Sequence, residues 1–145
     1  MSLQFRLWLR LVSTDKTVFS QLMLMSGLSP GYFSAFDEPT LDGIIENFIA
    51  STDWSPVEET IRVDLGLNVR EYAMRIKSPA LLITAMHDQI LPPAYSENLI
   101  PGAKTIEVDS GHLIFLEKPV ELASAILAFC RARVPSPSGT IEACK

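Results

Sequence analysis

The stretch PALLITAMHDQILPP, residues 79–93, decides the fold class of this chain. Its run 80–85 is short, continuous and apolar, and it lies between a proline and a His-Asp pair. A strand that is buried on both faces has this pattern, and such strands are typical of parallel sheets. A second extended run, KTIEV at 104–108, follows a helix-like stretch over 94–99 and a Pro-Gly turn. The right-handed crossover rule therefore predicts two parallel strands in one sheet.

The residues before this stretch predict helices. Apolar residues at helical spacing, cap residues and Gly or Pro stops mark five segments: 3–12, 16–25 ending at Gly27, a short one over 32–36, one after the cap residues 37–40, and one whose first turn holds Pro56. Pro119 opens a last amphipathic helix. The sequence thus divides into a helical region at 1–77, a strand-and-helix region at 78–134 and a Pro/Ser/Gly tail at 135–145 that we expect to be disordered.

The fold class expected is α/β with an incomplete sheet. A parallel sheet must be covered on both faces and normally has more than two strands. We therefore expect either that another chain supplies strands or that this chain is part of something larger.

Composition excludes several classes of protein. The 145 residues are 48% hydrophobic and 20% charged, as in an ordinary globular domain. A net charge of −5 argues against nucleic acid as a partner, since binding to a phosphate backbone needs a basic surface. No apolar stretch approaches the ~20 residues that span a bilayer, and the start lacks the features of a signal peptide. Cys130 and Cys144 have no zinc or redox spacing. We expect a cytoplasmic protein with no membrane partner, no metal and no cofactor.

Two residues have the placement of catalytic groups. Asp88 follows the first predicted strand and His112 follows the second, and the carboxyl ends of strands in open α/β sheets are where catalytic groups collect. A carboxylate that accepts the imidazole N–H sets the tautomer of a histidine that acts as a base. Taken singly, each residue is better explained by turn chemistry, which needs no functional site. Their equivalent positions at two strand ends favour a catalytic pair.

These motifs resemble the C-terminal third of α/β-hydrolase-fold enzymes. The resemblance covers roughly residues 76–134: a strand, the acid Asp88, a Pro-Gly-Ala turn at 101–103, a second strand, the pair Gly111-His112, and EKP at 117–119 before the last helix. One mild departure is Ala85, where the family often has glycine. The helical first half resembles, more loosely, the cap that such enzymes insert before the penultimate strand.

The resemblance implies that Asp88 and His112 are the acid and base of a Ser-Asp-His triad. Esterases, lactonases, C–C hydrolases and cofactor-free haloperoxidases share the pattern, and fold does not select among them. We expect hydrolysis of a small ester-like or lactone-like substrate by the complete enzyme.

The nucleophile and oxyanion loop of that family have no good counterpart here. The motif GLSPG at 27–31 fits G-x-S-x-G, with Ser29 at the position of the nucleophile. However, the oxyanion hole needs the backbone N–H of the next residue, and Pro30 has none. We expect a helix-ending turn instead, with Gly27 at the C-cap, and no serine-hydrolase activity from this chain alone. A compact hydrolase that uses Ser29 is the disfavoured alternative.

A different class of function also stays open. The exposed edge of a two-stranded sheet is a template for pairing, so the chain is alternatively a non-catalytic or partner-dependent module that forms homo-oligomers. Several other side chains have a functional interpretation, but we favour a structural one for each. His87 could tune Asp88, but we expect a solvated turn residue; Met23, Met25, Phe33 and Phe36 could line an apolar substrate pocket, but we expect them in the helical core. We expect Trp8 and Trp54 to be packing anchors and not substrate platforms, and Glu117 to complement a helix dipole.

Overall fold

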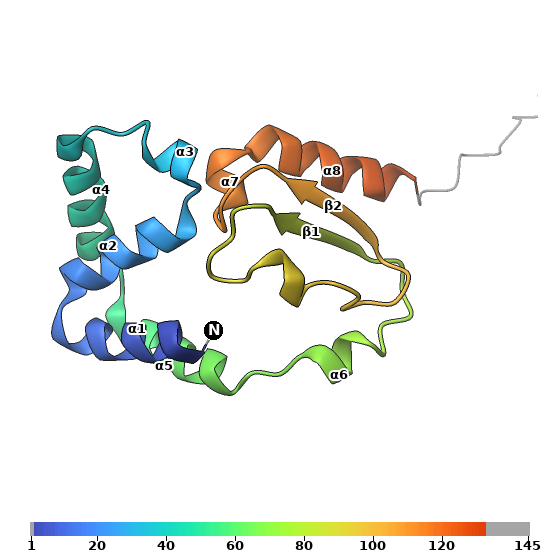
Figure 1. The fold of residues 1–145 in the computed structure, drawn as a ribbon, viewed down its shortest axis with the longest axis horizontal. Helices are drawn as coiled ribbons and strands as arrows, with labels where there is room; N and C mark the ends of the chain where they lie inside the picture. Colours follow the sequence, from blue (N-terminus) through green and yellow to red (C-terminus); the bar gives the residue numbers. More distant parts are fainter. Residues whose placement is uncertain (1, 133–145) are drawn as a thin grey trace, which may run out of the picture.

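The computed structural model describes residues 2–132, in which helices precede a small sheet (Figure 1). The helical segment, residues 2–73, comprises α1 (Ser2–Thr14), α2 (Lys16–Gly27), α3 (Pro30–Phe33), α4 (Glu38–Ser51), α5 (Trp54–Gly66) and α6 (Arg70–Ala73). The strand segment, residues 81–131, comprises β1 (Leu81–Ala85), the 3₁₀ turn η1 (Pro93–Tyr95), β2 (Lys104–Val108), α7 (Ile114–Glu117) and α8 (Pro119–Arg131). The predicted fold class, helices followed by a short parallel sheet and a final helix, is confirmed. The predicted disordered tail lies outside the described residues.

Aspartate caps explain where three of the helices begin. Asp15 accepts a hydrogen bond from the backbone N–H of Val18 at 3.0 Å at the start of α2. Asp37 does the same for Thr40 at 3.0 Å before α4, and Asp53 precedes α5. Such caps satisfy N–H groups that have no partner within the helix. Hydrogen bonds from Thr40 lower the pKa of Asp37 below its ordinary value.

The structure differs from the sequence prediction in some short elements. Residues 94–99 do not form a helix: a single 3₁₀ turn ends at Tyr95, and Asn98 takes a left-handed conformation with φ of 52° that no helix can contain. The helix predicted from residue 32 begins at Pro30. The short helices α6 and α7 were not predicted, because four residues are too few for a periodic pattern to be recognised.

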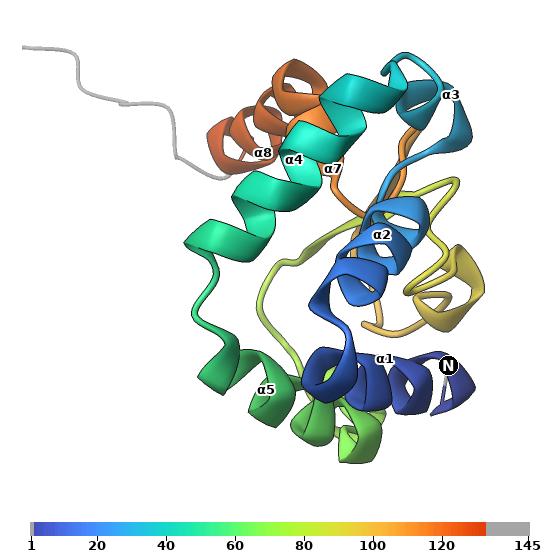
Figure 2. The ribbon, with the colours of Figure 1, turned by 90° about the vertical axis from the view of Figure 1, so that its left-hand side faces the viewer.

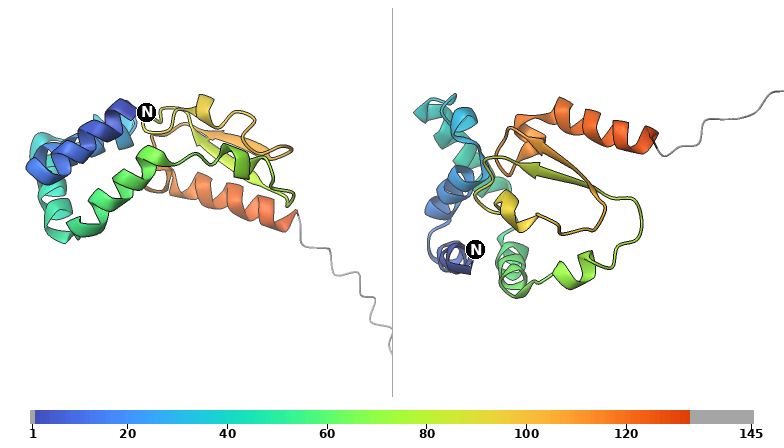
Figure 3. Two further views of the ribbon diagram at one scale, coloured as in Figure 1. Left: turned by 90° about the horizontal axis from the view of Figure 1, so that it is seen from below. Right: turned by 45° about the vertical axis from the view of Figure 1, so that its right-hand side comes forward.

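The two strands pair in parallel, as predicted, with Leu81 opposite Lys104 and Ala85 opposite Val108. Only the carboxyl end of β1 is buried. Ala85 is 3% exposed, whereas residues 81–83 are half-buried. The expectation that the whole strand is buried on both faces is therefore wrong. Within the described residues, β2 is the one strand that pairs with β1, so no further strand covers its other edge. Helix α8 runs alongside the sheet (Figures 1 and 3).

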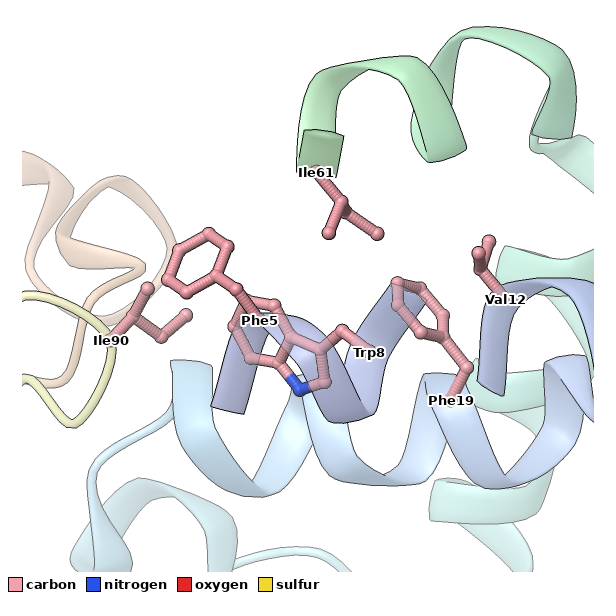
Figure 4. Close-up of a cluster of buried hydrophobic side chains, with 6 residues drawn as sticks. All are labelled: Phe5, Trp8, Val12, Phe19, Ile61 and Ile90. Carbon is pink, nitrogen blue, oxygen red and sulfur yellow. The ribbon is translucent and has the colours of Figure 1, made fainter. Parts of the chain in front are cut away.

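The main hydrophobic core lies inside the helical segment. Phe5 and Trp8 of α1 pack with Phe19 of α2 and Ile61 of α5, and the ring centroids of Trp8 and Phe19 are 6.4 Å apart (Figure 4). Trp8 is 4% exposed, which agrees with its interpretation as a packing anchor. One member of this core comes from the strand segment. Ile90, which lies two residues after Asp88 in the chain, packs into the core of the helical segment.

The carboxyl ends of both strands point toward the helical segment (Figures 1 and 3). Seen from the left-hand side of Figure 1, α4 lies in front of α7 and α8 (Figure 2). Backbone hydrogen bonds join the two segments directly, because Leu113 donates its N–H to the carbonyl oxygen of Gly27 at 3.0 Å. The loops that follow β1 and β2 are therefore held between the sheet and the helices.

Candidate active site

Asp88 and His112 meet beyond the ends of the two strands. Oδ2 of Asp88 lies 2.9 Å from Nδ1 of His112. The other carboxylate oxygen, Oδ1, accepts the backbone N–H groups of Ile90 and Leu91, each at 2.8 Å. The Asp88 side chain is only 10% exposed, and that of His112 is 34% exposed. Both carboxylate oxygens are thus occupied, and the carboxylate can neither rotate nor leave without breaking hydrogen bonds.

This arrangement sets the chemistry that the imidazole can perform. An ionised carboxylate only accepts hydrogen bonds, so the 2.9 Å contact places a proton on Nδ1 of His112. In the neutral ring the lone pair is then on Nε2, which is the form of a general base. The same carboxylate stabilises the imidazolium that forms when Nε2 takes up a proton.

The loop that carries His112 is anchored on both sides of that residue. Gly111 donates its backbone N–H to Oε1 of Glu117 at 3.0 Å, and Leu113 donates to Gly27. Gly111 also packs directly on the backbone of the turn between α2 and α3, where an added Cβ would lie 2.5 Å from the Ser29 nitrogen. Only glycine permits so close an approach.

Ser29, the candidate of the G-x-S-x-G motif, has a capping role in this structure. Its Oγ accepts the N–H of Tyr32 at 3.2 Å as the N-cap of α3, and donates to Oε2 of Glu117. Ser29 is 8% exposed, and Pro30 opens α3. Helix α2 ends at Gly27 with Leu28 as the C-cap, one residue later than the C-cap predicted at Gly27. The turn is a helix-to-helix connection and not a strand-to-helix elbow.

Glu117 has a role that sequence reasoning missed. It was expected to complement a helix dipole, but its carboxylate accepts hydrogen bonds from Ser29 and Gly111, residues that are far apart in the chain. The one local signal is an acidic residue close to a Gly-His pair whose backbone N–H groups lie outside any regular element. That signal does not identify the acceptor, because the contact depends on the tertiary fold.

His87 is not placed to tune Asp88. Its Nε2 lies 2.8 Å from Oδ1 of Asp109, and the two side chains are 46% and 71% exposed. The pair joins the loops after β1 and β2 on the solvent side, which agrees with the expectation of a solvated residue.

An apolar cavity of about 430 Å³ lies between α2, α4 and α7. Its walls include Ile90, two residues after Asp88, and Leu113, the residue after His112, together with Met23 and Phe48. Met25 and Phe33 line a different hollow on the outer side of α2 and α4. Of the four residues suggested for an apolar pocket, Met23 alone borders this cavity.

No group of three or more His, Cys, Asp or Glu side chains within residues 2–132 is arranged to hold a metal ion. No helix in this part of the chain is both long and apolar enough to cross a membrane.

Known proteins with the same architecture were compared with this chain. No family model matches the sequence. The enol-lactonase of Burkholderia xenovorans LB400 superimposes with a TM-score of 0.75 at 22% identity, over 88% of this chain and 50% of that enzyme. An α/β hydrolase enzyme from a Medee basin deep-sea metagenome library superimposes with a TM-score of 0.78 at 17% identity, over 90% and 50%. This chain has the fold of the C-terminal half of an α/β-hydrolase. The resemblance seen in the sequence is thereby confirmed at the level of fold.

One curated protein is similar to this chain in sequence. The pyrrolizixenacetamide deacetylase of Xenorhabdus hominickii is 33% identical over 129 residues, which are 87% of this chain and 48% of the deacetylase. The chain thus spans about half the length of this deacetylase and of the two solved structures above. Those relatives are hydrolases by name.

Proposed function

We propose that this chain supplies the acid and base of an α/β-hydrolase that cleaves small ester-like or lactone-like substrates. The observation that carries the proposal is the 2.9 Å contact between Asp88 Oδ2 and His112 Nδ1 at the carboxyl ends of two parallel strands. In this fold, groups at that edge meet the substrate. The enol-lactonase and the deacetylase, which act on acyl groups by name, support an acyl-transfer reaction.

The proposed reaction uses a serine from the part of the relatives' length that this chain does not span. Nε2 of His112 takes the proton of that serine as its oxygen attacks the substrate carbonyl, and then delivers the proton to the leaving group. A covalent acyl-enzyme remains. His112 next takes a proton from water, whose oxygen attacks the acyl carbon and releases the acid, and the serine recovers its proton. Asp88 holds the tautomer of His112 throughout.

Ser29 is not the nucleophile in this proposal. Its hydroxyl is hydrogen-bonded to Glu117 and Tyr32, and the residue after it is a proline without the N–H that an oxyanion hole requires. The second half of the relatives' length, which this chain does not span, is the natural source of the serine and the oxyanion donors. We infer that the chain alone does not hydrolyse esters.

The helical segment serves in this proposal as the cap, within the domain boundaries 1–77 and 78–134 expected from the sequence. It lies over the strand ends, and the apolar cavity between α2, α4 and α7 borders the residues next to Asp88 and His112. We infer that this cavity receives the apolar part of the substrate. A cytoplasmic location stays a prediction.

A chimera tests the function directly. The N-terminal half of the Xenorhabdus deacetylase, up to the start of its match, is joined to residues 1–145, and hydrolysis of p-nitrophenyl acetate is measured. We expect turnover by the chimera and its loss in His112→Ala. The 145-residue chain is treated in parallel with a fluorophosphonate probe, and we expect no adduct by intact mass. A chimera that folds and stays active after His112→Ala would refute the proposal, as would an adduct at Ser29.

The exposed sheet edge favours a second candidate function. Within the described residues β1 bonds to β2 alone, and side chains 81–83 are only half-buried, so β1 has an edge available to another strand. The alternative proposal is a partner-dependent module that self-associates through this edge. Light scattering after size exclusion decides: a dimer or larger assembly at micromolar concentration supports the alternative, and a monomer contradicts it.

A further inference from the structure

One carboxylate connects the helical segment to the loop of His112. Oε1 of Glu117 accepts the backbone N–H groups of Ser29, at 2.8 Å, and Gly111, at 3.0 Å. Oε2 accepts the hydroxyl of Ser29 at 2.5 Å. Ser29 is 88 residues away from Glu117 in the chain, and Gly111 is six residues away. Glu117 is therefore the point at which the α2–α3 turn, the His112 loop and α7 meet.

The buried donors need this acceptor. Ser29 and Gly111 are both buried, and their N–H groups are not part of a helix or strand ladder. A buried N–H without a partner is costly, so removal of the carboxylate forces both backbones to move or to admit water. Hydrogen bonds to an ionised acceptor are also shorter and stronger than neutral ones.

The contact acts on both sides of His112. Gly111 is bound through Glu117, and Leu113 is bound to the carbonyl oxygen of Gly27 at 3.0 Å. Gly111 itself rests against the backbone from Gly27 to Ser29, with no space for a Cβ atom. The residues immediately before and after His112 are thus both attached to one turn of the helical segment. Movement of that turn moves His112 relative to Asp88.

We propose that Glu117 is a positioning residue for His112, and that the GLSPG turn at 27–31 is the anchor through which it acts. The turn whose sequence fits the nucleophile motif G-x-S-x-G therefore holds His112, the proposed base, in place. In a complete hydrolase, this link makes the orientation of His112 depend on the position of the cap. This last step rests on the function proposed above.

The first test needs no variant. Amide hydrogen exchange of the 145-residue chain is followed by NMR at Gly111 and Ser29. Both lie outside helix and strand ladders, and we expect protection of about ten-fold or more over an unstructured peptide. The low-field proton on Nδ1 of His112 is recorded in the same sample. Exchange of both amides at the unstructured rate would overturn the proposal, because the Glu117 hydrogen bonds would then not be formed.

Variants of Glu117 and Glu121 separate the effect of the position of the carboxylate from the effect of its charge. In Glu117→Ala we expect exchange at Gly111 and Ser29 to rise by about ten-fold or more and the Nδ1 proton signal to broaden or vanish. Glu121→Ala is the matched control. It removes the same charge four residues later, from a 59% exposed side chain that contacts Lys118 at 3.9 Å, and we expect a wild-type spectrum. Glu117→Gln keeps an oxygen acceptor for both N–H groups, and we expect it to restore the Nδ1 signal.

Outcomes are read well below the unfolding temperature of each variant. A folded Glu117→Ala chain with an unchanged Nδ1 signal would overturn the positioning role. If Glu117→Ala does not fold, Gly111→Ala is used in its place, because the added Cβ displaces the same turn at 27–31. An unchanged Nδ1 signal in Gly111→Ala would also overturn the positioning role. These spectra do not depend on hydrolysis. An inactive chimera with responsive spectra refutes the proposed function alone, whereas an active chimera with unresponsive spectra refutes the positioning role alone.

Discussion

Nδ1 of His112 is 2.9 Å from Oδ2 of Asp88, and the register of the two strands accounts for this contact. Ala85 pairs with Val108, so the chain leaves both strands at the same level of the sheet. Asp88 follows three residues after the end of β1, and His112 follows four residues after the end of β2. Two loops of almost equal length therefore bring a carboxylate and an imidazole together.

Asp88→Ala tests that contact. Without the carboxylate, nothing selects the proton on Nδ1, and we expect the ¹⁵N spectrum of His112 to show a mixture of tautomers. In the chimera, kcat should fall by about 10⁴-fold, the effect of a wrong tautomer in serine hydrolases, with little change in KM. His87→Ala is the control, because His87 bonds to Asp109 and not to Asp88. A kcat within a few-fold of wild type in Asp88→Ala contradicts the assignment.

Met23→Ala tests whether the cavity beside α2 selects the acyl group. Removal of this side chain enlarges the cavity, and we expect kcat/KM of the chimera for p-nitrophenyl hexanoate to rise relative to acetate by about ten-fold. Met25→Ala is a matched control on the same helix, since Met25 is 56% exposed and lines another hollow. Equal ratios in the two variants mean that the cavity does not hold the acyl chain.

Phe19→Ala tests the helical core. Phe19 is 2% exposed and contacts the rings of Trp8 and Trp54, so truncation should lower the free energy of unfolding by about 3–5 kcal/mol. Urea titration measures the change. Val18→Ala, the adjacent position at 38% exposure, should change it by no more than about 0.5 kcal/mol. Similar values for both variants would show that the α1–α2 contact is not the core of the fold.

The exposed pair of His87 and Asp109 should contribute little to stability. The side chains are 46% and 71% exposed, and surface ion pairs are worth about 0–1 kcal/mol. A double-mutant cycle with His87→Ala and Asp109→Ala should give a coupling free energy below about 1 kcal/mol that decreases further in high salt. A larger coupling that resists salt would assign the pair a structural role in joining the two loops.

Acid should weaken the start of α4. The pKa of Asp37 is lowered, chiefly by hydrogen bonds from Thr40, so the ionised carboxylate stabilises the folded state at pH values above its unfolded-state pKa. That contribution is lost as the pH falls through the folded-state pKa. In Asp37→Asn, which retains a capping oxygen but no charge, we expect a shallower loss of stability with falling pH. Identical pH profiles of urea unfolding for the two proteins would contradict this account.

Local chemistry was enough to predict most of the fold. The caps at Asp15 and Asp37, the apolar run of β1 and the extended run of β2 act over a few residues, and they predicted the long helices and both strands. Parallel pairing followed from connection length. The proximity of Asp88 to His112 followed in turn from parallel pairing, because parallel strands end at the same edge. Patterns of this kind can be seen without a structure, since their cause lies in neighbouring residues.

The tertiary structure alone decided what the remaining side chains do. Glu117 was expected to interact with a helix dipole, yet it binds Ser29 across 88 residues. Ile90 had no role assigned from the sequence, yet it enters the core of the helical segment and holds the Asp88 loop there. The partner in neither contact can be identified from local sequence, because each contact forms only when both segments are already folded and their buried N–H groups and apolar surfaces need partners. That need arises from packing, which no short stretch of sequence contains.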